Sequence, residues 1–156
     1  MIKVQSEDFN LQVEYDLLRQ QSSVGAVVTF SGLVRDCNLG KKVSGLTLEH
    51  YPGMTEKSLT EIVEQAKQRW NILACRVIHR VGKLALQDQI VFVGVAALHR
   101  REAFACCEFI MDYLKTQAPF WKKECNEQGE SYWVDARETD AQALGKWRDN
   151  EAAHKK

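Results

Sequence analysis

Lys115 and Lys122 stand on either side of a proline, a spacing that can serve acid–base chemistry. Lys115 ends an apolar helical pattern, because Pro119 lacks a backbone N–H and disfavours helical backbone at the preceding residue. Lys122 then falls in a strand-like stretch that begins at Phe120. An ammonium held among apolar groups or other cations loses proton affinity and can act as a general acid or base near neutral pH. The alternative interpretation is that both lysines are solvated surface charges.

A His-Arg pair, His99-Arg100, follows an apolar strand-like run and opens the next helical pattern. The first turn of a helix offers free N–H groups and a partial positive charge, which suit a phosphate. Arginine adds a bidentate fork, and histidine adds a donor whose charge is adjustable. The same dipeptide recurs as His79-Arg80 at the end of another predicted strand, so the pair by itself is not specific.

Two further arginines, Arg35 and Arg137, each follow a predicted strand, where binding residues often gather. Either one taken singly reads as a solvated arginine or a salt-bridge partner. Convergence of these arginines with Lys115 and Lys122 would create a local cationic site in a neutral protein. The hypothesis from these residue types is a site for a phosphate ester.

Hydrophobic patterns predict the elements that position these residues. Strand-like runs cover 2–5, 24–34, 43–51, 73–79, 89–98, 120–125 and 131–136. Helical periodicity covers 8–20, 56–70 and 101–116, and a capping box of Thr139 with Gln142 predicts a short last helix. Because the strands cluster in runs instead of alternating strictly with helices, the pattern predicts an α+β fold.

Several finer expectations accompany these elements. The run 24–34 is expected to be a buried strand, with 43–51 as the return strand of its hairpin. The runs 120–125 and 131–136 are expected to form a second hairpin, with Gly129 in the turn. Thr55 is the expected cap of the helix over 56–70. Apolar faces are expected at Leu11, Tyr15 and Leu18 of the first helix and at Ala103, Phe104, Cys107, Ile110, Met111 and Leu114 of the third.

Composition limits the classes of function. The 156 residues favour one domain, and 21 basic residues balance 21 acidic ones, so no global field attracts nucleic acid or an anionic membrane. No apolar run is long enough to cross a membrane, and MIKVQSEDFN lacks the apolar core of a signal peptide. We therefore expect a cytoplasmic protein. Five cysteines without CxxC spacing and four scattered histidines predict packing thiols and no metal site.

Two other chemistries remain open at this point. Cys125 lies close in sequence to Lys122 and Lys123, which could lower its pKa and make it a nucleophile. No histidine is placed by a known motif to serve it. The aromatic and basic stretch 120–123 could also contact nucleic acid, although four residues and zero net charge give thin support.

Several long segments, in order, give a more specific signal than any dipeptide. They are GAVVTFSGLVR (25–35), LTLEHYPGMTE (46–56), VIHRVGKL (77–84), IVFVGVAALHR (90–100), FIMDYLKTQAPFWKKE (109–124) and WVDARE (133–138). Together they resemble the large, catalytic subunit of molybdopterin synthase, the MoaE family. The resemblance runs from about 25 to 147 within a single expected domain, 1–156.

The resemblance implies an α/β hammerhead-like fold with an additional antiparallel sheet or hairpin, and a sulfurtransferase of molybdenum cofactor biosynthesis. Sulfur would come from the thiocarboxylated C-terminal glycine of a small ubiquitin-like (MoaD-like) subunit. It would pass to cyclic pyranopterin monophosphate and form the dithiolene of molybdopterin, without a resident cofactor. The implied assembly is a homodimer of large subunits that binds two small subunits as a heterotetramer, with no nucleic acid and no membrane.

The resemblance also implies roles for individual residues. Lys115 and Lys122 match the family's catalytic lysines. Residues that hold the pterin and phosphate match Arg35, His99, Arg100 and Arg137, of which the His-Arg pair would come from the partner protomer. Phe30 and Met111 match apolar pocket walls, and Glu124 matches an acidic residue near the second lysine. Two rival functions are a non-catalytic scaffold that binds a ubiquitin-like tail and a phosphorylated ligand, and a lysine Schiff-base enzyme.

Overall fold

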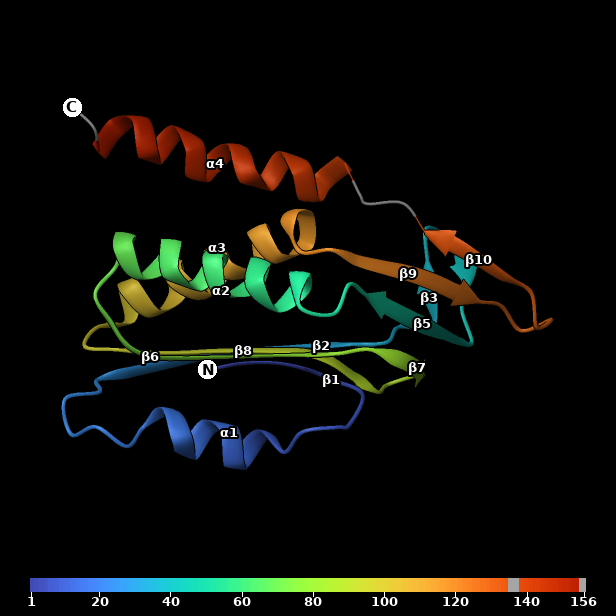
Figure 1. Cartoon of the computed structure of the whole chain (residues 1–156), viewed down its shortest axis with the longest axis horizontal. Helices are drawn as coiled ribbons and strands as arrows, with labels where there is room; N and C mark the ends of the chain where they lie inside the picture. The colour runs from blue at the N-terminus through green and yellow to red at the C-terminus, as the bar shows by residue number, and fades with distance from the viewer. Residues whose placement is uncertain (135–137, 155–156) are drawn as a thin grey trace.

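The structure is a computed structural model that describes residues 1–134 and 138–154 (Figure 1). Its helices are α1 (Leu11–Leu18), α2 (Met54–Arg69), α3 (Arg100–Gln117) and α4 (Glu138–His154). Its strands are β1 (Ile2–Gln5), β2 (Ala26–Leu33), β3 (Cys37–Asn38), β4 (Lys41–Lys42), β5 (Gly45–His50), β6 (Ile72–Arg80), β7 (Gly82–Ala85), β8 (Gln89–Ala97), β9 (Phe120–Cys125) and β10 (Ser131–Val134). The predicted α+β class is confirmed.

The main sheet has the strand order β1-β6-β8-β2. Strand β8 is antiparallel to both of its neighbours, whereas β1 runs parallel to β6. The central strand β8 is buried from Val91 to Ala97, as its nearly continuous apolar sequence requires. Strand β2 lies at the sheet edge and is half-exposed, so the expectation of a buried strand over 24–34 is wrong for the single chain.

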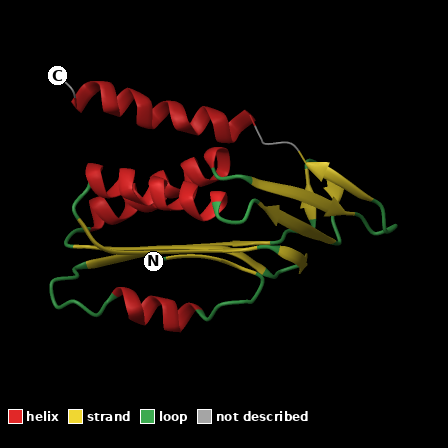
Figure 2. Ribbon diagram, in the orientation of Figure 1, coloured by secondary structure: helices red, strands yellow, loops and turns green. Residues whose placement is uncertain are grey.

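Helices cover both faces of the main sheet (Figure 2). The buried residues of α2 and α3 recur at helical spacing and pack on one face of the sheet, with Phe109, Ile110, Leu59 and Ile62 among the largest. On the opposite face, Leu18 of α1 packs against Ile78 and Phe92. Helix α4 lies over α3, where the buried Trp147 meets the ring of Phe109 at 5.4 Å.

A second, antiparallel sheet has the order β10-β9-β5-β7 and extends from one end of the molecule (Figure 1). The expected hairpin of β9 with β10 is confirmed over the described residues, with Gly129 at φ +81° in its turn. Strand β5 pairs with β7 and β9, so its expected hairpin with the run 24–34 is wrong. Hydrophobic alternation shows that a strand forms, but the choice of partner depends on long-range contacts.

Other local expectations also need correction. Gly53 is the N-cap of α2, its N–H donates to Glu56 at 2.6 Å, and Thr55 lies inside the first turn. Phe104 of α3 is 61% exposed, and Leu11 and Tyr15 of α1 are also largely exposed. The four-residue strand β7 was not predicted, and α4 is 17 residues long instead of short.

Candidate active site

The junction between α3 and β9 places Lys115 and Lys122. Ala118 caps α3 in an extended conformation, as expected for a residue before proline, and the N–H of Phe120 donates to the Ala118 carbonyl at 2.9 Å. Lys115 lies in the last turn of α3, exposed to solvent, and Met111 lies one turn earlier, half-buried against the core. The chain therefore reverses within a few residues and carries one lysine on each arm.

Lys122 lies in the middle of the second sheet, opposite Leu48 of β5 and Val134 of β10. Its ammonium is 3.3 Å from Oε1 of Glu124, and its side chain is 38% exposed. Glu124 is 2% exposed and also accepts a hydrogen bond from Asn38 Nδ2 at 2.6 Å. Glu124 thus contacts Lys122, as the resemblance implied. Because Glu124 is buried, it orients the lysine and is not itself accessible to a ligand.

Phe120 and Lys122 lie two residues apart and share one face of β9, which is also the face of His50 because His50 pairs directly with Phe120. The Phe120 ring stacks on the imidazole of His79 with ring centroids 3.8 Å apart. This stack joins the second sheet to β6 of the main sheet beneath the junction.

Sequence reasoning did not assign His79 to the site. It used the dipeptide His79-Arg80 as a neutral comparison for His99-Arg100. Burial, together with the nearby charges of Lys115 and His50, lowers the pKa of His79 to about 4. The buried imidazole is therefore neutral at physiological pH, and its Nδ1–H donates to the Arg80 carbonyl at 2.9 Å. The sequence signal that could have indicated a buried histidine was its place at the end of an apolar strand.

Arg35 lies at the same end of the molecule as the two lysines. Its neighbour Val34 is held by the β7–β8 turn, since its N–H donates to Asp88 and its carbonyl accepts from Gln87, at 3.0 and 2.9 Å. Because α3 returns along β8, the end of α3 lies over the edge where β8 begins and β2 ends (Figure 1). Arg35 is exposed there and lines an open pocket with Asp36, Cys37, Leu39, Leu86 and Gln87.

Phe30 lies on the edge strand β2, paired with Val93. It is on the same face as Val28, which packs against the core beneath α2 and α3. Its side chain is nevertheless 40% exposed, so an apolar ring is open at the edge of the main sheet. This exposure is consistent with a pocket wall or with contact to another chain.

His99 and Arg100 are exposed and lie at the other end of α3, where His99 is the N-cap. Lys115 follows Arg100 by fifteen positions within α3, a rise of about 22 Å along the helix axis. One chain therefore does not bring this pair to the lysines. Arg137, the remaining predicted cation, lies outside the described residues.

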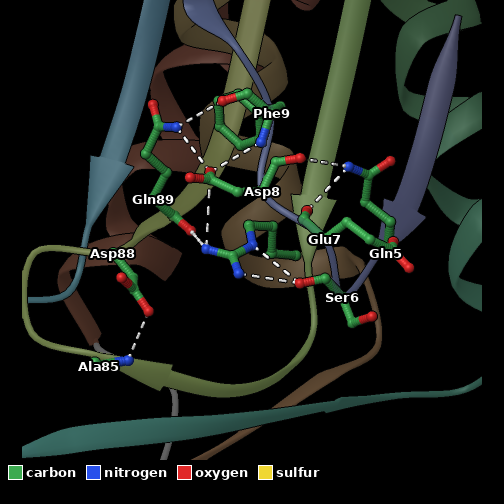
Figure 3. Close-up of polar contacts among 9 residues, drawn as sticks. Gln5, Ser6, Glu7, Asp8, Phe9, Ala85, Asp88 and Gln89 are labelled. Carbon is green, nitrogen blue, oxygen red and sulfur yellow. Dashed lines mark hydrogen bonds and ion pairs between the residues drawn. The ribbon is translucent and has the colours of Figure 1, made fainter.

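A network of polar contacts fixes the segment between β1 and α1 against the main sheet, at the end of the sheet where β8 begins (Figure 3). The guanidinium of Arg80 donates to the carbonyls of Ser6 and Gln89 at 3.0 Å each. The Gln89 amide donates to Asp8 at 2.8 Å, which with the Phe9 N–H lowers the pKa of that carboxyl. Since His79 precedes Arg80, this network also fixes the end of β6 that carries the imidazole.

Three of the five cysteines are buried and therefore poorly suited to nucleophilic catalysis, whereas Cys125, the candidate considered from the sequence, is half-buried. Burial raises the pKa of the Cys75 thiol to about 11 and that of Cys107 to about 12, and it also raises the pKa of Cys106. The residues that the structure describes include no group of three His, Cys, Asp or Glu side chains arranged to hold a metal ion. Within the same residues, no helix is both long and apolar enough to span a membrane.

Comparison with known proteins shows the family of this chain. The family model described as "MoaE protein" matches residues 4–117, a span that begins before Gly25 and includes Lys115 but not Lys122. The molybdopterin synthase catalytic subunit of Vibrio cholerae is 59% identical over 146 residues, covering 94% of this chain and 97% of that protein.

Solved structures give the same result. The molybdopterin biosynthesis MoaE protein of Burkholderia ambifaria superposes with a TM-score of 0.80 at 50% identity, covering 94% of this chain and 97% of that chain. A complex of subunits 1 and 2 of the molybdopterin-converting factor of Helicobacter pylori shares the fold, with a TM-score of 0.71 at 16% identity over 87% and 91% of the two chains. The chain belongs to the MoaE protein family.

Proposed function

We propose that this chain is the catalytic subunit of a molybdopterin synthase. It takes sulfur from the thiocarboxylated C-terminal glycine of a small ubiquitin-like subunit and transfers it to cyclic pyranopterin monophosphate, which becomes the dithiolene of molybdopterin. Membership of the MoaE family supports this assignment. The observation that carries it is the pair of lysines, Lys115 and Lys122, presented by one short junction at an end of the sheet that also bears Arg35.

The reaction needs groups that bind anions and transfer protons more than it needs a protein nucleophile, because a thiocarboxylate is itself nucleophilic. Each delivery forms a carbon–sulfur bond to the pterin substrate while a carbon–oxygen bond at the same carbon breaks, and the departing oxygen takes a proton. Water then cleaves the acyl carbon–sulfur bond, which leaves a carboxylate on the glycine and a thiolate on the product. No electrons are gained or lost, so the reaction requires no resident redox cofactor.

Lys115 is our candidate for the general acid and base, and for stabilising the tetrahedral centre at the acyl carbon. Lys122 assists by orienting the glycyl thiocarboxylate, with Glu124 fixing its ammonium at 3.3 Å. Arg35 and Arg137 bind the anionic substrate, and Phe30 and Met111 form apolar walls. His99 and Arg100 retain the phosphate, so that the half-sulfurated intermediate stays bound for the second delivery.

The position of His99 and Arg100 supports a dimeric site. The separation of about 22 Å between Arg100 and Lys115 along α3 favours a site in which a second chain supplies the His-Arg pair. In the proposed homodimer, the pair from one protomer reaches the lysines of its partner. Two such sites would bind two small subunits, giving a heterotetramer, and we propose that this assembly acts in the cytoplasm.

The test uses purified enzyme, thiocarboxylated small subunit and cyclic pyranopterin monophosphate, with molybdopterin as the measured product. Lys115→Ala and Lys122→Ala should each lower the rate on the order of 100-fold or more. Lys123→Ala is the matched control, because Lys123 lies on the opposite face of β9, where its ammonium is 5.6 Å from the Trp133 ring centroid. A Lys115→Ala enzyme that retains full turnover would favour the scaffold function instead.

A further inference from the structure

The junction that carries Lys115 and Lys122 is held by a buried threonine from a distant part of the chain. Thr55, which is 0% exposed, donates from its hydroxyl to the carbonyl oxygen of Pro119 at 3.0 Å. The same hydroxyl accepts from the N–H of Tyr51 at 3.0 Å, and the Thr55 N–H donates to the Tyr51 carbonyl at 2.9 Å. Both capacities of the hydroxyl are therefore used.

Pro119 makes this contact important for the geometry of the turn. Proline has no backbone N–H, so its carbonyl is the only polar group through which its backbone can be held. The Ala118 carbonyl already accepts from the N–H of Phe120 across the turn. The Thr55 hydroxyl is thus an anchor that ties the middle of the junction to the start of α2.

A second contact fixes the junction at the next residue, Phe120. The ring of Phe120 stacks on the imidazole of His79, with an interplanar angle of 19°. His79 is 4% exposed and is fixed by its hydrogen bond to the Arg80 carbonyl. The junction is therefore attached to α2 through Pro119 and to β6 through Phe120, between the two lysines.

We propose that Thr55 and His79 are positioning residues that set where Lys115 and Lys122 lie relative to each other. Neither residue is placed to touch substrate in this proposal. They act through Pro119 and Phe120, and the inference rests on the proposed function of the two lysines. A shift of about 1 Å at a catalytic group can cost on the order of 100-fold in rate, so loosening this turn should affect turnover more than binding.

The first test compares Thr55→Val, which keeps the side-chain shape and removes the hydroxyl, with Thr55→Ser, which keeps the hydroxyl. Thr55→Val should lower kcat by about 10-fold to 100-fold with KM for the pterin changed by less than about 3-fold. Thr55→Ser should restore most of kcat. Thr60→Val is the matched control, because the Thr60 hydroxyl donates to the Glu56 carbonyl within the same helix at 2.8 Å, away from the junction.

A stability control separates positioning from general loosening of the fold. Ile62 is a buried residue of the same helix, 2% exposed, and Ile62→Val should lower the melting temperature without lowering kcat at 25 °C. The inference is overturned if Ile62→Val loses as much kcat as Thr55→Val, or if Thr55→Val retains the wild-type kcat. Should Thr55→Val fail to fold, the same assay is applied to His79→Leu, which removes the stack on Phe120. The inference then requires a lower kcat for His79→Leu, and a wild-type kcat overturns it.

Failure of the inference can be told apart from failure of the proposed function. Wild-type enzyme that forms no molybdopterin under the assay contradicts the function. The inference is then judged by crystal structures of wild type and Thr55→Val, in which it requires a displaced main chain between 115 and 122. An unmoved junction overturns the inference whatever the activity.

Discussion

The ammonium of Lys122 lies 3.3 Å from Oε1 of Glu124, a carboxylate that is 2% exposed and that also accepts from Asn38 at 2.6 Å. A buried carboxylate needs its cation, whereas the lysine is partly solvated. The pair therefore stabilises the protein mainly by compensating Glu124, and it fixes the direction of Lys122. These two roles can be separated.

We predict that Lys122→Met destabilises the protein by about 1–2 kcal/mol, because it leaves the Glu124 carboxylate without its cation. Adding Glu124→Gln removes that buried charge, so the double variant should recover most of the stability but not the activity. Urea unfolding and product formation measure the two effects in one double-mutant cycle. Additive stability changes, with no recovery in the double variant, would contradict this account of the pair.

A dimeric site predicts complementation between two inactive variants. In a mixed dimer of Arg100→Ala with Lys115→Ala, one site combines both losses and the other is intact. Random co-assembly makes half of the dimers mixed, so activity should return to about one quarter of wild type. Co-expression with two affinity tags isolates the mixed dimer, which should have about half of the wild-type activity. Activity no higher than that of the two separate variants would contradict a shared site.

The contact between α3 and α4 gives a prediction about stability. The indole Nε1–H of Trp147 donates to Asp112 at 2.6 Å, and the ring is 3% exposed. Burial raises the pKa of Asp112, and this hydrogen bond opposes that rise. Trp147→Phe should lower the free energy of unfolding by about 1–3 kcal/mol, because a partly buried carboxylate loses its donor.

The control for this substitution is Trp133→Phe. Trp133 is 56% exposed, so the change should stay within about 0.5 kcal/mol. Urea denaturation of both variants measures the difference. Equal stability of the two variants would show that the hydrogen bond from Trp147 contributes nothing.

Local sequence patterns predicted most of the elements, but of their pairings only the hairpin of β9 with β10. Pro119 marked the end of α3 and the start of β9 because its effect on the backbone is local. The run that became β5 was recognised as a strand, yet it was assigned to the wrong sheet, since pairing with β9 and β7 depends on contacts distant in sequence. Phe104 was expected to be buried, because periodicity shows which side of a helix is apolar. It does not show how much of that side the neighbouring elements cover.

The residues of the candidate site also divide into those that local patterns predict and those that depend on long-range contacts. Lys115, Lys122 and Arg35 were predicted from their places at or near the ends of elements, and the fold brings these residues to one end of the molecule. The long separation of Arg100 from Lys115 follows from helix length and could have been calculated from the sequence. The contacts of Thr55 and His79 could not be calculated in this way, because each joins a residue at least 41 positions away, Pro119 for Thr55 and Phe120 for His79.

His79 gives a prediction about pH. Its pKa is lowered from 6.5 to about 4 in the folded chain, chiefly by burial and also by the charges of Lys115 and His50. Above pH 6.5 the imidazole is neutral in both states, so it adds no pH dependence. Between pH 6.5 and 4 the unfolded chain binds a proton that the folded chain does not, and stability is therefore lost as the pH falls.

The full shift corresponds to about 3 kcal/mol at 1.36 kcal/mol per pKa unit. His79→Phe keeps a flat ring against Phe120 and removes the titrating group. Urea unfolding at several pH values between 7.5 and 4.5 should show a flatter dependence for this variant than for wild type, with the curves diverging below pH 6.5. Parallel curves would mean that the imidazole takes up its proton equally well in the folded chain, which is incompatible with its burial between Phe120 and the main sheet.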